Sequence, residues 1–134
     1  MSINQSIYEI ASKPLISIDI KEYVSNAVKF MYERGIRRLA VKEGNQIVGI
    51  FNISSLLKIL IEGSSPSNLT LSMIELEKPI YINKTIPIKD AVETMNNKNV
   101  TSLLVGEPEE VLGILTTHDI ISILSSINVK RGIY

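Results

Sequence analysis

The sequence of 134 residues contains no cysteine, no tryptophan and only one histidine. The absence of cysteine excludes disulfides and thiolate metal sites, so the fold must be held together by packing. The single histidine, His118, has no histidine or cysteine companion for a metal site, and we interpret it as a surface or cleft contact. A chain without cysteine also suits a reducing compartment, and we expect a cytoplasmic protein.

Net charge and long apolar runs are absent as well. Lysine and arginine balance aspartate and glutamate at 14 each, so no overall field attracts nucleic acid or an acidic membrane surface. No apolar run reaches the roughly 18 residues of a membrane span, and the first residues do not have the pattern of a signal peptide. We therefore expect a soluble protein whose partners include neither a membrane nor nucleic acid.

The sequence does contain an internal repeat. When residues 13–16 are laid on residues 78–81 and one residue is dropped from the first copy, glycine, proline and methionine fall together in one register. The matched pairs are Lys13 and Lys78, Pro14 and Pro79, Ala27 and Ala91, Val28 and Val92, Met31 and Met95, Leu39 and Leu103, Val41 and Val105, Gly49 and Gly113, and Leu60 and Leu124. The length suits one compact domain, so the repeat indicates a domain that is duplicated inside.

Each copy has the order strand, helix, strand, strand, helix. In the first copy the residue pattern predicts strands over 15–19, 37–42 and 46–51 and helices over 21–34 and 53–62. In the second copy it predicts strands over 80–83, 101–105 and 111–115 and helices over 87–98 and 117–126. Gly35 is the predicted stop of one helix, and Asn52 is the predicted cap of another.

This order predicts an α/β (α+β) fold of two βαββα repeats, over residues 1–63 and 71–134, with a polar linker over residues 64–70. A unit with so few strands cannot bury its sheet alone, so the two units should pack about a pseudo-two-fold axis and share a ligand cleft. Helical lead-ins are expected over residues 3–11 and 71–76. The side chains predicted to be buried are Val24, Val28, Met31, Val92 and Met95, and residues 64–68 should be exposed.

Several motifs in this order resemble the CBS domain, a family whose members occur as tandem pairs called Bateman modules. The resemblance covers nearly the whole chain. Its carriers are the proline-led first strands, the helices from Ala27 to Met31 and from Ala91 to Met95, the strands at 36–41 and 100–105, and above all Gly-Ile-Leu-Thr-Thr-His-Asp-Ile at 113–120. The resemblance implies a regulatory module, not an enzyme, that binds AMP, ADP or ATP, or alternatively S-adenosylmethionine or NAD, and controls an attached or associated protein.

Thr116 and Asp119 carry the chemistry of the last motif. Thr116 ends a strand and starts a helix, so its hydroxyl can cap backbone N–H groups while the helix N-terminus attracts phosphate. Asp119, one turn further, can accept hydrogen bonds from two ribose hydroxyls. From the residues alone, the pair is also explained as a capping box that stabilises the helix. The duplicated architecture and the family resemblance favour the ligand site.

In the family a site is composite, and it joins the signature helix of one repeat to the first and middle strands of the other. The resemblance implies a competent site at Lys13, Pro14, Leu15, Ile36, Arg37, Arg38, Ile114, Thr116, His118 and Asp119. Consecutive arginines in a strand point to opposite faces, so one of Arg37 and Arg38 can address phosphate. The first copy departs from the motif, and a second, weaker site is implied at Ile50, Asn52, Ser55, Lys78, Pro79, Ile80, Val100, Thr101 and Ser102.

No residue pattern of an active site accompanies these motifs, and we expect no cofactor. Because Asn52 and Ser55 replace the threonine and aspartate of the motif, a second hypothesis is an adaptor with a degenerate cleft, whose role is dimerisation. The helices after each hairpin carry more apolar side chains than one pair needs, which predicts a homodimer. These side chains are Leu56, Leu57, Leu60, Ile121 and Leu124.

Overall fold

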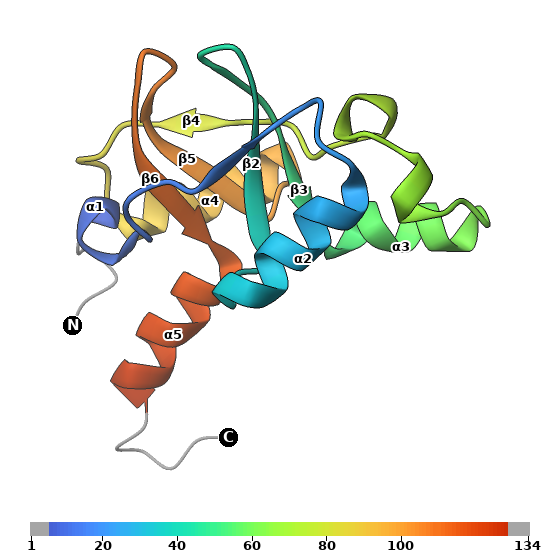
Figure 1. Ribbon diagram of the computed structural model, residues 1–134. Helices are drawn as coiled ribbons and strands as arrows, with labels where there is room; N and C mark the ends of the chain where they lie inside the picture. The colour runs from blue at the N-terminus through green and yellow to red at the C-terminus, as the bar shows by residue number, and fades with distance from the viewer. Residues whose placement is uncertain (1–5, 129–134) are drawn as a thin grey trace. The chain divides into compact units, whose positions relative to one another are not determined.

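The computed structural model describes residues 6–128 and divides the chain into two compact units. We call Ile16–Pro79 the first unit, and Met1–Leu15 together with Ile80–Tyr134 the second unit. Each unit contains its own three-stranded sheet (Figure 1). The two sheets and the repeated order of elements confirm the α+β class and the two βαββα repeats.

The first unit has its sheet in the order β1-β2-β3. Its elements are β1 (Ser17–Asp19), α2 (Val24–Arg34), β2 (Arg38–Glu43), β3 (Gln46–Asn52) and α3 (Ile53–Ile61). β1 pairs with β2 in parallel, and β2 pairs with β3 antiparallel. The first strand and the β2–β3 hairpin therefore form one sheet. Val24 and Ala27 of α2 are fully buried against Phe51 and Leu71, and they form the core of this unit.

The second unit repeats this architecture and adds a helix from the start of the chain. Its elements are α1 (Ile7–Ile10), β4 (Tyr81–Ile82), α4 (Ile88–Lys98), β5 (Ser102–Glu107), β6 (Glu110–Thr116) and α5 (Thr117–Asn128). The sheet order is β4-β5-β6, with the same parallel and antiparallel pairings. Ile7 of α1 is fully buried in one core with Ile88 and Ala91, so the first part of the chain packs on the second repeat.

Local irregularities recur at equivalent places in the two units. The register of the hairpin shifts between Val41 and Lys42 in the first unit and between Val105 and Gly106 in the second. Gly35 ends α2 in the left-handed region with φ of 63°, and Asn99 ends α4 there with φ of 54°. Glycine and asparagine are the residues that tolerate this conformation best. The duplication therefore extends to a bulge and a helix stop.

Residues 64–76 depart from the prediction in part. Pro66–Asn68 form a short 3-10 helix, η1, and Ser64 and Pro66 are partly buried rather than exposed. The helix predicted over residues 71–76 is only a 3-10 turn, η2 (Leu71–Met73). The reason is that the chain is extended at Ile74, where φ is −118° and ψ is 160°, and Glu77 then pairs with Ile50 of β3.

The prediction that five side chains are buried is confirmed in full at two positions and in part at two others. Val24 and Met95 are buried, and Val28 and Met31 pack partly buried against the first core. Val92, however, is 38% exposed, because α4 directs Ile88, Ala91 and Met95 inward and Val92 lies beside that face. The helix predicted over residues 3–11 corresponds to α1, and residues 3–5 lie outside the described part of the chain.

Candidate functional site

The start of α5 is organised by Thr116 and Asp119. Asp119 Oδ2 accepts hydrogen bonds from Thr116 N at 2.8 Å and from Thr116 Oγ1 at 3.1 Å. In return, Asp119 N donates to Thr116 Oγ1 at 3.2 Å. This reciprocal arrangement is a capping box, so the stabilising role that the residues alone suggested is present in the structure. It uses only one of the two carboxylate oxygens in short hydrogen bonds.

An extended segment of the chain lies beside β6 and reaches the other oxygen of Asp119. Ser12 N donates to Ile114 O at 2.9 Å, and Ile114 N donates to Ser12 O at 3.0 Å. The Ser12 hydroxyl then donates to Asp119 Oδ1 at 3.5 Å, a long hydrogen bond. A carboxylate oxygen has two acceptor positions, so Oδ1 keeps capacity for a hydroxyl of a ligand.

Gly113 allows this close approach of the two segments. A Cβ atom at this position would lie 2.5 Å from Ser12 O and 2.9 Å from Lys13 Cγ. Any side chain here would therefore push the segment away from β6. The glycine of the sequence motif thus has a structural reason, which is to admit the chain that carries Ser12, Lys13 and Pro14.

Lys13 is the first basic residue of the predicted site, and its amino group is turned to α1. Its Nζ donates to Tyr8 O and lies 4.0 Å from the centroid of the Tyr8 ring, where cation–π attraction holds it. Lys84 Nζ lies 5.9 Å from the same centroid. The part of Lys13 that lies next to β6 is therefore its backbone and aliphatic stem rather than its charge.

The residues predicted for the competent site divide between the two units. The second unit contains the segment before β1 and the start of α5, with these members: Lys13, Pro14, Leu15, Ile114, Thr116, His118 and Asp119. Ile36, Arg37 and Arg38 belong to the first unit, where they lead into and begin β2. Ser12 was not predicted, although it precedes the Lys-Pro pair whose repetition marks the segment.

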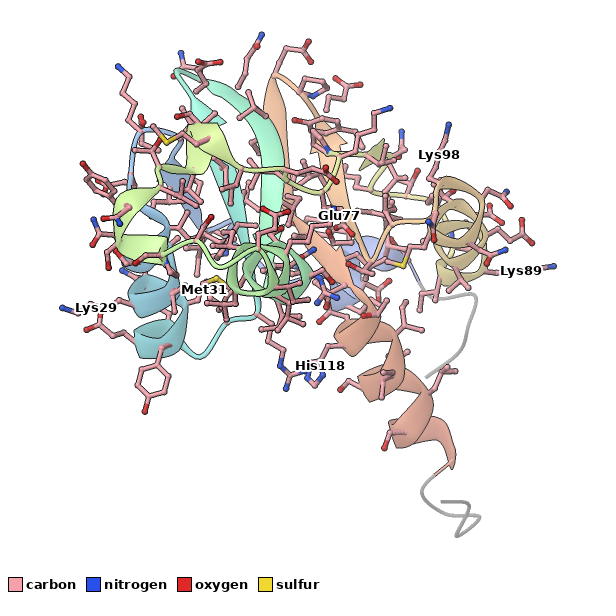
Figure 2. The ribbon with its side chains drawn as sticks, turned by 90° about the vertical axis from the view of Figure 1, so that its right-hand side faces the viewer. Lys29, Met31, Glu77, Lys89, Lys98 and His118 are labelled. Carbon is pink, nitrogen blue, oxygen red and sulfur yellow. The ribbon has the colours of Figure 1, made fainter. Side chains whose placement is uncertain are left out.

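His118 is exposed in the first turn of α5, as Figure 2 shows. Within residues 6–128, no group of three or more histidine and acidic side chains is placed to hold a metal ion. The same part of the chain has no helix with the length and apolar character required to cross a bilayer.

The first unit has a second helix start with a similar cap. Asn52 Oδ1 accepts hydrogen bonds from Ser55 N at 3.2 Å and from Ser55 Oγ at 3.4 Å. Asn52 and Ser55 are each only 7% exposed. An extended segment again lies alongside the last strand, because Glu77 and Ile50 exchange two backbone hydrogen bonds of 2.9 Å.

The residues predicted for the weaker site also divide between the units. Ile50, Asn52, Ser55, Lys78 and Pro79 lie in the first unit, and Ile80, Val100, Thr101 and Ser102 lie in the second. In the second unit, Ile80 O accepts from Leu104 N at 2.8 Å, so Ile80 leads the chain into the parallel strand pair. Thr101 O accepts from Thr117 N at 3.2 Å, which joins the start of β5 to the start of α5.

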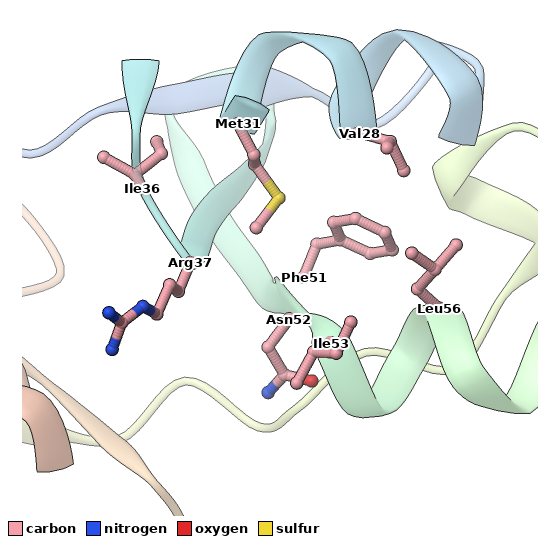
Figure 3. A pocket seen from close by; sticks show the side chains of 8 residues that line it. All are labelled: Val28, Met31, Ile36, Arg37, Phe51, Asn52, Ile53 and Leu56. Carbon is pink, nitrogen blue, oxygen red and sulfur yellow. The ribbon is translucent and has the colours of Figure 1, made fainter. Parts of the chain in front are cut away.

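Each unit also has an apolar groove between two of its elements. In the first unit a hollow of about 350 Å³ lies between α2 and α3, and in the second a hollow of about 410 Å³ lies between α4 and α5. Figure 3 shows Val28, Met31, Phe51 and Leu56 converging on the first groove, while Arg37 points away from them. The grooves contain equivalent residues of the two repeats, and Val92 lines the second. The excess of apolar side chains on the helices after each hairpin was the one signal that could have indicated these grooves.

Comparisons with known proteins agree with the duplication. A family model described as CBS domain matches residues 7–62 and again residues 72–126. Arabinose 5-phosphate isomerase of Francisella tularensis is 29% identical over 101 residues, which are 75% of this chain but only 31% of that protein. The chain therefore spans about a third of the length of this curated relative.

Solved structures have the same fold at low sequence identity. A protein of Burkholderia ambifaria with CBS domains gives a TM-score of 0.81 at 20% identity, with 91% of this chain and 95% of that chain covered. A CBS domain pair in complex with 5′-methylthioadenosine and S-adenosyl-L-methionine gives a TM-score of 0.77 at 21% identity, with 92% and 98% covered. A hexameric CBS-CP12 protein from bloom-forming cyanobacteria gives a TM-score of 0.79 at 20% identity, with 90% and 68% covered.

Proposed function

Since the chain belongs to the CBS domain family and carries two CBS domains, we propose that it is a regulatory module that binds an adenosine-containing ligand. AMP, ADP and ATP are the leading candidates, and S-adenosylmethionine and NAD are the alternatives. The module acts by changing its shape, or its affinity for a protein partner, when the ligand is bound. Catalysis is not part of this proposal.

The observation that carries the proposal is how the two carboxylate oxygens of Asp119 are hydrogen-bonded. Its Oδ2 is engaged by the capping box, whereas within residues 6–128 its Oδ1 receives the long hydrogen bond from Ser12 alone. A pair of ribose hydroxyls can donate to this oxygen and replace the Ser12 contact, and α5 offers the positive end of its dipole to a phosphate.

The adenosine moiety is supported by one structural relative. The CBS domain pair with a TM-score of 0.77 was solved with 5′-methylthioadenosine and S-adenosyl-L-methionine, and both of these compounds contain adenosine. For a phosphate contact we retain one of Arg37 and Arg38 of the predicted site, and Ile36 remains a proposed apolar member of that site. The residues predicted for the weaker site remain a second proposed location for the same class of ligand.

Thermal unfolding with a panel of AMP, ADP, ATP, NAD and S-adenosylmethionine tests this function. A ligand that binds only the folded protein adds about 2.7 kcal/mol to stability at a hundred times its dissociation constant. We expect a rise in Tm of several degrees with at least one adenine nucleotide, and none with GTP as the control. If no compound of the panel raised Tm, the adaptor hypothesis would be favoured over the sensor.

A homodimer is the assembly that we propose for the module. Apolar side chains of α3 and α5 remain exposed in the single chain: Ile53 60%, Leu57 49%, Leu60 52%, Ile61 84%, Ile121 64% and Leu124 38%. A cluster of such side chains next to apolar grooves is typical of an interface, and a second copy presents the same complementary surface. None of these six exposed side chains of α3 and α5 belongs to the residues predicted for the ligand sites.

Sedimentation equilibrium tests the dimer. We expect the wild-type protein to be dimeric at micromolar concentration and Leu60→Glu to shift it to monomer, since a charge on an apolar interface must be desolvated. Met73→Glu is the matched control, because Met73 is 66% exposed and belongs to η2 instead of the apolar faces of α3 and α5. A wild-type monomer at this concentration, with or without AMP, would contradict the proposed assembly.

A further inference from the structure

The two helix starts carry the same kinds of side chain at exchanged positions. In the second unit, the helix supplies a carboxylate, Asp119, and the extended segment supplies a hydroxyl, Ser12. In the first unit, the equivalent helix position is a hydroxyl, Ser55, and the equivalent position of the extended segment is a carboxylate, Glu77. The apparent loss of the acid from the first copy is therefore an exchange between two neighbouring segments.

The backbone geometry makes the two positions equivalent. Ser12 exchanges hydrogen bonds of 2.9 and 3.0 Å with Ile114, and Glu77 exchanges hydrogen bonds of 2.9 Å in both directions with Ile50. Ile114 and Ile50 each lie two residues before the capping residue of the following helix. A glycine precedes each of them, and a Cβ on Gly49 would lie 2.6 Å from Leu76 Cβ, just as one on Gly113 would meet Ser12.

This pairing directs the Glu77 side chain to the helix start. Residues that face each other in an antiparallel pair share a face of the strand pair, and residues two apart on a strand also share a face. Glu77 therefore lies on the face of Ile50 and of the capping residue Asn52. In the second unit the same relation brings the Ser12 hydroxyl to Asp119, at 3.5 Å. Glutamate is longer than serine and reaches further over this face.

The surroundings suit a ligand with several hydroxyls. Asn52 and Ser55 are each 7% exposed, and their polar groups are already joined to each other through Asn52 Oδ1. Glu77 is only partly buried, and Figure 2 labels its side chain. A carboxylate accepts hydrogen bonds at both oxygens, whereas the Ser55 hydroxyl alone cannot hold two ribose hydroxyls.

We infer that Glu77 is the carboxylate that binds the vicinal ribose hydroxyls of an adenosine ligand at the start of α3, in place of the aspartate missing there. This inference rests on the proposed function, and it adds a binding residue to the site predicted to be weaker. The site at the start of α3 then has a carboxylate, and the extended segment supplies it instead of the helix. Ser55 then has little direct role in ligand binding.

Calorimetric titration of the full chain with AMP and with 2′-deoxy-AMP tests the role of Glu77. We expect two AMP molecules per wild-type chain, and one in Asp119→Asn, which retains the site beside α3. In the Asp119→Asn background, Glu77→Gln should weaken AMP at least tenfold, equivalent to about 1.4 kcal/mol. It should weaken 2′-deoxy-AMP less, because that ligand has lost one of the two hydroxyls. Glu77→Asp should keep part of the preference for AMP over 2′-deoxy-AMP.

Glu75→Gln is the matched control in the same background. Glu75 lies two residues earlier in the chain, where its Oε1 pairs with Lys58 Nζ at 2.8 Å on the exposed surface. We expect this variant to leave both affinities unchanged. Glu77→Gln with unchanged AMP affinity, or with equal losses for AMP and 2′-deoxy-AMP, would overturn the inference while leaving the proposed function in place. If the wild-type chain bound no AMP, both the inference about Glu77 and the proposed binding of AMP would be overturned.

Discussion

Asp119→Ala should lower the affinity for AMP at the start of α5 by at least tenfold. The substitution removes the acceptor for two ribose hydroxyls, and hydrogen bonds to charged groups contribute about 1.5–3 kcal/mol each. It also removes the partner of Thr116 N and Thr116 Oγ1, which lie 2.8 and 3.1 Å from Asp119 Oδ2. The lost cap costs roughly 1 kcal/mol of stability, so the variant should remain folded.

Calorimetry and circular dichroism together check this result. Ser55→Ala is the control, because Ser55 occupies the equivalent position in the first repeat and is not the acid of that site. We expect it to leave AMP affinity nearly unchanged. If Asp119→Ala bound AMP with the affinity and stoichiometry of the wild type, the start of α5 would not be a ligand site.

Gly113→Val should reduce both the stability of the protein and its affinity for AMP. A Cβ on Gly113 would lie 2.5 Å from Ser12 O, a backbone atom that cannot move without breaking the two hydrogen bonds between Ser12 and Ile114. Losing these bonds costs at least about 2 kcal/mol. Displacing the segment also disturbs α1, whose Ile7 is fully buried, and removes Ser12 and Lys13 from the site.

Gly35→Asn is the control for Gly113→Val. Gly35 has φ of 63° and has no atom within 4 Å of its Cβ position. The second repeat already has an asparagine, Asn99, with φ of 54° at the equivalent helix stop. We expect a change in unfolding free energy of a few tenths of a kcal/mol for the control. Equal unfolding free energies for Gly113→Val and the wild type in urea would show that the close approach does not constrain this strand.

Local signals were sufficient for most of the fold. The Gly35 stop and the Asn52 cap depend on the conformation of one residue and its immediate neighbours, and both are present. The capping box of Thr116 and Asp119 is equally local. The duplication was also visible, because the apolar periodicity and the glycines recur in one register.

Features that depend on distant segments could not be predicted in the same way. Ser12 and Asp119 are 107 residues apart in the sequence, and only the pairing of Ser12 with Ile114 brings them together. The exchange of carboxylate and hydroxyl between segments was missed for this reason, since the motif comparison considered only the helix positions. The helix predicted over residues 71–76 is wrong because the chain is extended at Ile74 and Glu77 pairs with Ile50, which is distant in the sequence.

Binding of adenosine ligands at the helix starts is tested most directly by NMR. Isotope-labelled protein is titrated with AMP, and the backbone amide resonances are followed to saturation. We predict saturable shifts for Ser12, Ile114 and Asp119, and loss of these shifts in Asp119→Asn. No shift at millimolar AMP, or shifts that leave Ser12, Ile114 and Asp119 unaffected, would contradict the assignment of the ligand site.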